Sequence, residues 1–271
     1  MADSALILII LTPLAGALLV ILAGRWPNLR EAISIGTGLL LVAQIISIAP
    51  SVLDGSALRQ VIATPVPQLP LAFEFEPLGL LFGLIASSLW VITTIYAIGY
   101  MRGHNESNQT RFFVFFAIAI SATMGVALAA NLFTLFVFYE LLTLSTYPLV
   151  THAGTVEARQ GGRVYIGILI GTSMAFLLPA IIATWYLTGS TDFQVGGILS
   201  GKASGPVVGI LFALFVFGIG KAALMPFHRW LPAAMVAPTP VSALLHAVAV
   251  VKAGVFAILK ISVYIFGIDL L

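Results

Sequence analysis

The sequence predicts an all-α integral membrane protein, a single bundle of about eight transmembrane helices in which helix seven is discontinuous. The first observation is composition: 60% of the 271 residues are hydrophobic and 8% are charged, and the mean hydropathy is +1.11. An ordinary soluble domain has roughly a quarter charged residues. The second is that apolar segments of about 20 residues, the length of a membrane span, recur along the chain. The third is a block of prolines between the last two segments, which predicts a broken helix.

Composition also excludes several classes of function. The formal net charge is only +2 and no basic run is longer than two residues, which argues against nucleic acid as a partner. The chain has no cysteine, so it carries no disulfide, thiol nucleophile or cysteine-ligated iron–sulfur cluster. No nucleotide, metal or nucleophile motif is visible. We therefore expect no cofactor and no redox chemistry in this chain, and whether it belongs to an enzyme complex stays open.

Eight apolar segments are long enough to span a bilayer. The first follows Met-Ala-Asp-Ser without a basic region, so we interpret it as a retained helix and not as a cleaved signal. The predicted spans cover residues 5–23, 31–49, 78–100, 111–129, 131–150, 164–187, 206–225 and 241–266.

Basic residues mark alternate connections between these spans. The second, fourth and sixth connections hold only Arg59 and Lys202. The other connections hold Arg25, Arg30, Arg102, Arg111, Arg159, Arg163 and Arg229. By the positive-inside rule the arginine-bearing connections lie in the cytoplasm, so we expect both termini outside a cell membrane, inner or plasma.

The long connection over 50–77 is predicted to lie outside. It holds four prolines and the alternating sequence LAFEFE at 71–76. Alternation of this kind favours a short hairpin or an interfacial strand over another helix.

The block between the last two spans is the predicted functional site. Pro226, Pro238 and Pro240 interrupt an apolar region that also carries Lys221. Interrupted helices are tolerated in membranes only where the loose backbone is buried in protein or lines a wet cavity. Trp230, next to His228 and Arg229, fits an interfacial anchor at the end of span seven.

Two ionisable residues in apolar spans are predicted to work together. Glu140 lies near the middle of span five with no cation within a helical turn, so it is either protonated or held ionised by another helix. Lys221 is its natural partner, because spans five and seven run in the same direction. Making and breaking this ion pair would move a proton. A purely structural ion pair between helices is the alternative.

Span eight carries three more ionisable residues. His246 suits a proton relay, although a lone histidine in a bundle is often a packing residue. Lys252 lies near the centre of the span, and Lys260 lies nearer its outer end, where it would equally well extend to the interface. His246 and Lys260 lie about 40° apart around an ideal helix and would share a face, whereas Lys252 would point elsewhere.

Three stretches carry a resemblance to a known family. GKAALMPFHRWLPAAMVAPTPVSALLHAVAVVKAG, at 220–254, resembles the seventh-to-eighth helix signature of the antiporter-like subunits of respiratory complex I, membrane-bound hydrogenases and Mrp-type cation/proton antiporters. NLFTLFVFYELLTLSTYPLV, at 131–150, is similar to the family's fifth helix, and FEPLGLLFGLI, at 75–85, to the start of its third.

The resemblance implies a proton-conducting bundle built on inverted five-helix repeats. Residues 1–100 would be the opening helices one to three, and 111–266 helices four to eight, the first repeat. It further implies that Glu140 pairs with Lys221 and that His246 and Lys252 pass protons onward. The sequence ends at Leu271, before a second repeat, so a partner chain supplies that repeat or the chain is a truncated product.

The expected function is therefore proton translocation, with or without coupled sodium, within a multisubunit membrane complex. An alternative is the proton-pumping arm of an NADH:quinone oxidoreductase- or hydrogenase-type complex. A further alternative is a structural half-subunit that is needed only for assembly. The expected partners are other membrane subunits, a chain with the second repeat, and the lipid bilayer.

Overall fold

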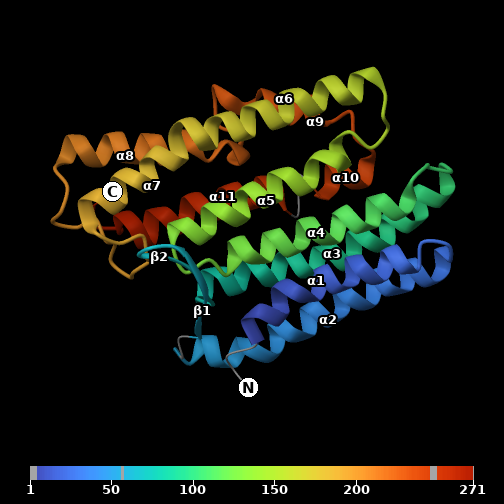
Figure 1. Cartoon of the computed structure of the whole chain (residues 1–271), viewed down its shortest axis with the longest axis horizontal. Helices are drawn as coiled ribbons and strands as arrows, with labels where there is room; N and C mark the ends of the chain where they lie inside the picture. The colour runs from blue at the N-terminus through green and yellow to red at the C-terminus, as the bar shows by residue number, and fades with distance from the viewer. Residues whose placement is uncertain (1–4, 56–57, 245–248, 271) are drawn as a thin grey trace.

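The computed structural model describes residues 5–55, 58–244 and 249–270, which form an elongated bundle of helices lying side by side (Figure 1). Among the described residues, six helical segments are long and apolar enough to cross a membrane. The first five are α1 (Ala5–Leu22), α2 (Pro27–Leu53), α3 (Pro77–Gly103), α4 (Gln109–Ala127) and α5 (Leu132–Val150). The predicted spans one to five are therefore confirmed as helices.

The sixth span is one continuous rod with an irregular turn at its middle. It joins α6 (Val156–Thr172), the π-helical turn η1 (Ser173–Leu177) and α7 (Leu178–Thr188). Pro179 lies just after the π-turn and cannot donate the backbone hydrogen bond that a regular helix would need there. The bulge places η1 against the end of the next helix, where the predicted site lies.

The last part of the chain is broken into short pieces. After α8 (Gly205–Gly218) come η2 (Gly220–Ala222), η3 (Phe227–Arg229), α9 (Trp230–Ala234) and α10 (Thr239–Ala243). The chain then continues as α11 (Val250–Ile261) and the π-turn η5 (Ser262–Phe266).

This break confirms the discontinuous helix seven and corrects two predicted spans. Span 206–225 ends as a helix at Gly218, since the following residues form a 3-10 turn. Span 241–266 is not one helix, because Ala249 lies in a bend before α11 begins. The predicted number of eight spans is consequently not confirmed.

The predicted hairpin is confirmed between α2 and α3. Strands β1 (Arg59–Val66) and β2 (Leu69–Glu74) pair antiparallel. Backbone hydrogen bonds join β2 to the link between α4 and α5: the Ala130 amide donates to the Ala72 carbonyl, and the Glu74 amide to the Leu128 carbonyl. The hairpin therefore closes one end of the bundle, which we call the hairpin end (Figure 1).

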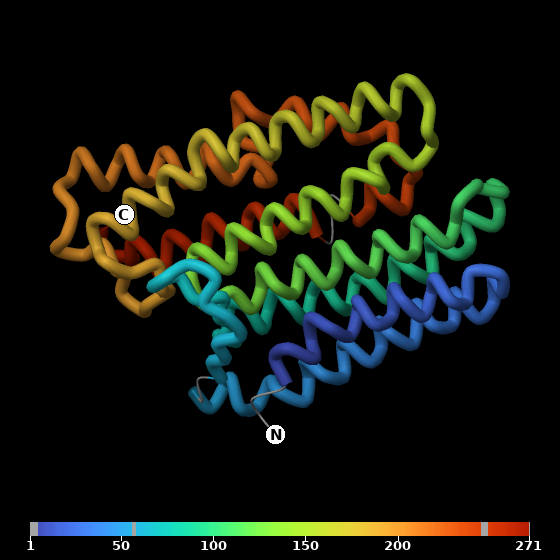
Figure 2. Tube along the Cα trace, in the orientation of Figure 1, coloured from blue at the N-terminus to red at the C-terminus, as the bar shows by residue number. Residues whose placement is uncertain are grey.

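The opposite end, the loop end, holds the connections α1–α2, α3–α4 and α5–α6 (Figure 2). The basic residues of these three connections thus lie together at one end, as the alternating charge pattern predicts. Between the two ends, α4 runs through the centre, and most of its side chains are buried.

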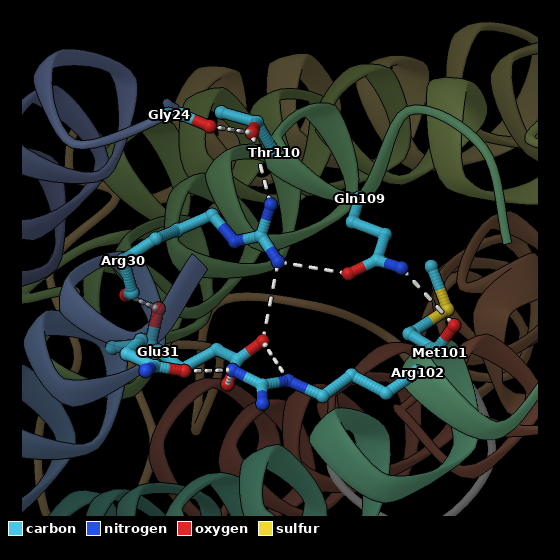
Figure 3. Close-up of polar contacts among 9 residues, drawn as sticks. Gly24, Arg30, Glu31, Met101, Arg102, Gln109 and Thr110 are labelled. Carbon is cyan, nitrogen blue, oxygen red and sulfur yellow. Dashed lines mark hydrogen bonds and ion pairs between the residues drawn. The ribbon is translucent and has the colours of Figure 1, made fainter. Parts of the chain in front are cut away.

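A cluster of charged side chains ties three helices together at the loop end (Figure 3). Arg30 and Glu31 on α2 are both nearly buried, and Glu31 accepts hydrogen bonds from both Arg30 and Arg102 of α3. Arg30 also donates to Gln109 at 2.8 Å and to Thr110 at 3.2 Å, both in the first turn of α4. Two arginines around one carboxylate therefore fix the relative positions of α2, α3 and α4.

Candidate functional site: a buried lysine at the helix break

The centre of the site is the ammonium group of Lys221, which is fully buried. Its Nζ donates to the backbone carbonyl of Tyr139 at 2.8 Å and to the hydroxyl of Thr143 on α5. The same nitrogen lies 3.2 Å from the centroid of the Tyr139 ring. The backbone amide of Lys221 donates to the Tyr139 hydroxyl at 3.0 Å, so one tyrosine contacts both ends of the lysine. All of these partners are uncharged.

Two glycines let the broken chain come close to the neighbouring rod. A Cβ on Gly218 would lie 2.3 Å from the backbone nitrogen of Leu177 in η1, and one on Gly220 would lie 2.4 Å from the Thr172 hydroxyl. On the other side, a Cβ on Gly254 of α11 would lie 2.3 Å from the backbone nitrogen of Ala222. The segment that carries Lys221 is therefore clamped between the sixth span and α11.

Trp230 satisfies a carbonyl that the helix break leaves free. Its indole nitrogen donates to the Gly220 carbonyl at 2.8 Å, and its ring packs edge-on against Tyr165, 5.5 Å away. Trp230 is fully buried, so the expectation that it anchors the interface is wrong. A carbonyl without a partner inside the bundle would be costly, and the indole N–H removes that cost.

Glu140 lies on α5 between the two residues that bind Lys221. Its Oε1 is buried and has no hydrogen-bond partner among the residues that the structure describes. Within the same residues, no ion pair of 4.0 Å or less joins it to Lys221. The expected direct contact is therefore absent in this conformation, although the lysine is bound within one turn of the glutamate on the same helix.

α5 also carries a stripe of buried hydroxyl groups that was not predicted from the sequence. Tyr139, Thr143 and Thr146 are fully buried and follow the i, i+4, i+7 spacing of one helix face. The Thr146 hydroxyl lies 2.6 Å from the hydroxyl of Tyr165 on α6. The spacing is visible in the sequence and would have indicated this stripe. Together these hydroxyl groups form a row of polar groups from Lys221 towards the loop end.

Lys260 differs from the expectation of a lysine that extends to the interface. It is fully buried, and its Nζ donates to the Ala129 carbonyl at 2.7 Å and pairs with Oε1 of Glu76 at 2.7 Å. Glu76 directly precedes α3 and was not singled out from the sequence. Only the fold brings these two charges together, because they are far apart along the chain.

The remaining predicted residues lie elsewhere. Lys252 is exposed and lines an apolar groove of about 320 Å³ between α3 and α11, so it does not join Lys221 or Lys260. His246 lies outside the described residues. Pro226 directly precedes η3, Pro238 precedes α10 and Pro240 lies in its first turn. In the described part of the chain, no three histidine, aspartate or glutamate side chains gather as metal ligands would.

The chain matches the model of a known family over its second half. The model described as "NADH:quinone oxidoreductase/Mrp antiporter, TM" matches residues 129–269, which include α5, the helix break and α11.

Curated relatives resemble the chain over most of its length. A Rhizobium meliloti protein described as a probable K(+)/H(+) antiporter component is 34% identical over 96% of this chain, and a putative antiporter subunit mnhA2 of Staphylococcus haemolyticus is 33% identical over 78%. The chloroplastic NAD(P)H-quinone oxidoreductase subunit 5 of Ipomoea purpurea is 30% identical over 92%. The chain spans only 26%, 27% and 37% of these three relatives, respectively.

Two solved structures have the same fold. A chain of the Mrp complex from Dietzia sp. DQ12-45-1b aligns with 99% of this chain and 50% of its own length, with a TM-score of 0.81 and 23% identity. A chain of the membrane-bound sulfane sulfur reductase, an archaeal respiratory membrane complex, aligns with 94% of this chain and 40% of its own length, with a TM-score of 0.79 and 23% identity.

Proposed function

Because the chain belongs to the NADH:quinone oxidoreductase/Mrp antiporter transmembrane family, we propose that it is a proton-translocating subunit of a multisubunit membrane complex. The names of the R. meliloti and S. haemolyticus relatives favour an antiporter, in which proton movement is coupled to a monovalent cation. The quinone oxidoreductase relative supports the second candidate, the proton-pumping arm of a respiratory complex. In both cases the chain itself moves protons and carries out no redox step.

The observation that carries the proposal is the buried ammonium of Lys221 at a helix break. Ionisable groups inside a membrane are costly and are retained chiefly on ion or proton pathways. Here the Lys221 ammonium is surrounded by a carbonyl, a hydroxyl and an aromatic ring, all from α5. Glu140 is the acidic residue of that helix. A buried ammonium without a close countercharge is costly to the fold, so a purely structural role does not account for it.

The proposed step is an exchange of partners by Lys221. When its ammonium turns towards Glu140, the two opposite charges stabilise each other and the lysine holds its proton. When it lies against Thr143 without a countercharge, as in this structure, burial favours release of the proton. The hydroxyls of Thr146 and Tyr165 offer the next hydrogen-bonding positions towards the loop end. After Lys221, His246 and Lys252 carry protons towards the rest of the complex.

We propose that a partner chain completes the proton pathway. The chain covers about half or less of the proteins that it resembles, and these names describe whole subunits or complexes. In this proposal a separate chain contributes the helices of a second repeat. The exposed Lys252 supports this arrangement, because an ammonium on an apolar face is better covered by protein than by lipid.

The proposed orientation places the loop end in the cytoplasm and both termini outside, in the inner or plasma membrane of the cell. Its support is the positive charge of the loop-end connections. Arg25, Arg102, Arg111, Arg159 and Arg163 all belong to this end.

The test is proton transport by membrane vesicles that contain the whole complex. Glu140→Gln and Lys221→Ala should each abolish transport while the complex assembles normally. Lys202→Ala is a matched control, since this lysine lies in an exposed loop and its ammonium donates to the Thr188 carbonyl. Normal transport by either site variant would overturn the proposal. A change in complex yield alone would instead favour the structural half-subunit.

A further inference from the structure

A small cavity of about 120 Å³ lies at the hairpin end. Five segments frame it: the end of β2, the start of α3, the α4–α5 link, the connection from α7 to α8, and η5. Backbone hydrogen bonds join these segments, since the Phe193 amide donates to the Ala130 carbonyl and the Gln194 amide donates to the Tyr264 carbonyl. The lining residues are Glu74, Glu76, Pro77, Ala130, Phe193, Val195 and Tyr264. The cavity is thus part of the fold and reaches the surface beside the exposed Val195.

The Glu76–Lys260 ion pair lies at the inner side of this cavity. The Glu76 side chain is 14% exposed and that of Lys260 is fully enclosed. The Phe193 ring lies against the ammonium, with its centroid 4.8 Å from Nζ. Two further titratable groups, Glu74 and Tyr264, also line the cavity.

The surrounding charges leave Glu76 as the only partner of Lys260 among the described carboxylates. Glu74 pairs instead with Arg59 at 3.7 Å, and Arg59 also contacts Asp192 at 2.9 Å. These groups are partly exposed. The hairpin end thus has an outer, solvated ion pair network and one inner pair that connects the cavity to the bundle interior.

We propose that the Glu76–Lys260 pair is the site at which protons exchange between water at the hairpin end and the interior of the bundle. This inference rests on the proposed function and extends it to residues that the Lys221 site does not include. Glu76 would be the group that meets water, and Lys260 the group that faces inward.

The chemistry needs only transfer of protons between oxygen and nitrogen. A proton from water in the cavity adds to the Glu76 carboxylate and removes its negative charge. Lys260 is then a buried ammonium without a countercharge, and it releases a proton to a water molecule on the inner side. Transfer from neutral Glu76 to the lysine restores the ion pair. One proton enters and one leaves in each cycle, and the reverse order moves a proton outward.

Three properties of the pair fit exchange better than simple stabilisation. A buried ion pair contributes little net stability compared with apolar side chains of the same size. Burial raises the pKa of the Glu76 carboxyl against the opposing effect of Lys260, so its proton affinity is shifted towards neutral pH. Lys260 is also on the helix that clamps the Lys221 segment. Gly254, the contact point, is six residues earlier, about 9 Å along the helix.

The first test compares transport by the complex with both charges removed together. Glu76→Gln with Lys260→Gln leaves no unpaired charge, so the complex should assemble normally while transport falls by at least about tenfold. Asp192→Asn is the matched control at the same end, because Asp192 contacts the outer Arg59 and does not line the cavity. Transport at the wild-type rate by the doubly substituted complex would overturn the inference.

The two proposals fail in different ways in the same assay. If Lys221→Ala transports normally, the proposed function fails. If Lys221→Ala is inactive and the double glutamine variant is fully active, only the exchange site at the hairpin end fails, and the pair is structural.

A second test does not depend on assembly of the charge variants. The chain has no cysteine, so a single cysteine in place of Tyr264 reports access to the cavity. A membrane-impermeant thiol reagent should label Tyr264→Cys from the hairpin side only and should block transport. Ser200→Cys, exposed in the connection from α7 to α8 but outside the cavity lining, should be labelled without loss of transport. Labelling of Tyr264→Cys that leaves transport intact would contradict the inference.

Discussion

Two enclosed lysines in this bundle use backbone carbonyl groups as partners. Lys221 binds the Tyr139 carbonyl and Lys260 the Ala129 carbonyl, at 2.8 and 2.7 Å respectively. They differ in their other contacts, since Lys260 has a carboxylate and Lys221 has a hydroxyl. At the residue scale this difference decides their chemistry. A lysine without a paired countercharge is the easier one to deprotonate.

The Thr143 hydroxyl should matter more than other buried threonine hydroxyls. Thr143→Val keeps the shape but removes an acceptor from Lys221, which should destabilise the protein by about 1.5–3 kcal/mol and slow transport. Thr184→Val is the control: Thr184 is also fully buried, but its hydroxyl donates only to the Ala180 carbonyl of its own helix. Thermal unfolding and proton flux would be measured for both. Equal losses in the two variants would show that Lys221 does not depend on this hydroxyl.

His152, in the connection between α5 and α6, is a buried histidine beside an arginine. It is buried, its Nε2 donates to the Ser107 carbonyl at 3.0 Å, and Arg111 donates to its backbone carbonyl. Burial, followed by the charge of Arg111, lowers the pKa of His152 below its usual value, against the opposing effects of the hydrogen bond to the Ser107 carbonyl and the charge of Glu106. The unfolded chain therefore binds a proton more readily than the folded protein just below pH 6.5.

The stability of the loop end should consequently fall as the pH decreases from 7 to 5. Stability linked to His152 is fully present above the unfolded pKa of about 6.5 and is lost as the pH falls towards the lower folded value, by at most about 1.4 kcal/mol per pH unit. The check is the melting temperature of the purified protein across this range. His152→Gln should flatten the profile, and an unchanged slope in that variant would assign the pH dependence to other groups.

At the element scale, the important feature is a helix that stops inside the bundle. α8 ends at Gly218, and the polypeptide then turns back through η2 and η3 before α9. Free backbone groups in such a break need partners, and Trp230 supplies one to Gly220. The break is stable because neighbouring helices approach it closely at glycines.

Gly254 is the position where α11 meets the Lys221 segment. Gly254→Ala should displace α11, because the added Cβ would lie 2.3 Å from the Ala222 backbone nitrogen, and overpacking costs typically about 1–3 kcal/mol. Gly167→Ala, in the interior of α6 with no atom within 4 Å of the added Cβ, should be neutral or stabilising by up to about 1 kcal/mol. Melting temperatures of both variants would check this. A Gly254→Ala protein as stable as wild type would mean that α11 and the Lys221 segment can move apart at little energetic cost.

At the scale of the whole molecule, one face of the bundle is suited to another protein. The groove between α3 and α11 has a volume of about 320 Å³, and Lys252 is the charged group in its otherwise apolar lining. In the proposed complex this groove would be covered by protein, because a charged group that faces lipid is costly.

Cysteine labelling would test this covering. Lys252→Cys should react with a membrane-permeant maleimide in the isolated chain and should be protected in the complex. Ser200→Cys should react in both, since it lies in an exposed connection at the hairpin end. Equal labelling of Lys252→Cys in the isolated chain and in the complex would show that no protein covers the groove.

Much of the architecture could be predicted because apolar length is a local property. The first five spans, the hairpin and a break in helix seven all follow from runs of apolar residues, alternation and prolines, although the helix already ends at Gly218, before the prolines that predicted the break. The predicted span over 241–266 was wrong because local composition does not reveal the bend at Ala249. Apolar residues alone cannot distinguish one helix from two short ones.

The sequence by itself determined that this is a membrane bundle with a broken helix and ionisable groups inside it, since hydropathy and proline act locally. Only the tertiary structure decided the partners of those groups: Tyr139 and Thr143 for Lys221, and Glu76 for Lys260. It also placed Lys252 on the outer face, away from both. The physical reason is that contacts between distant helices depend on packing, which is a property of the whole bundle and not of any one segment.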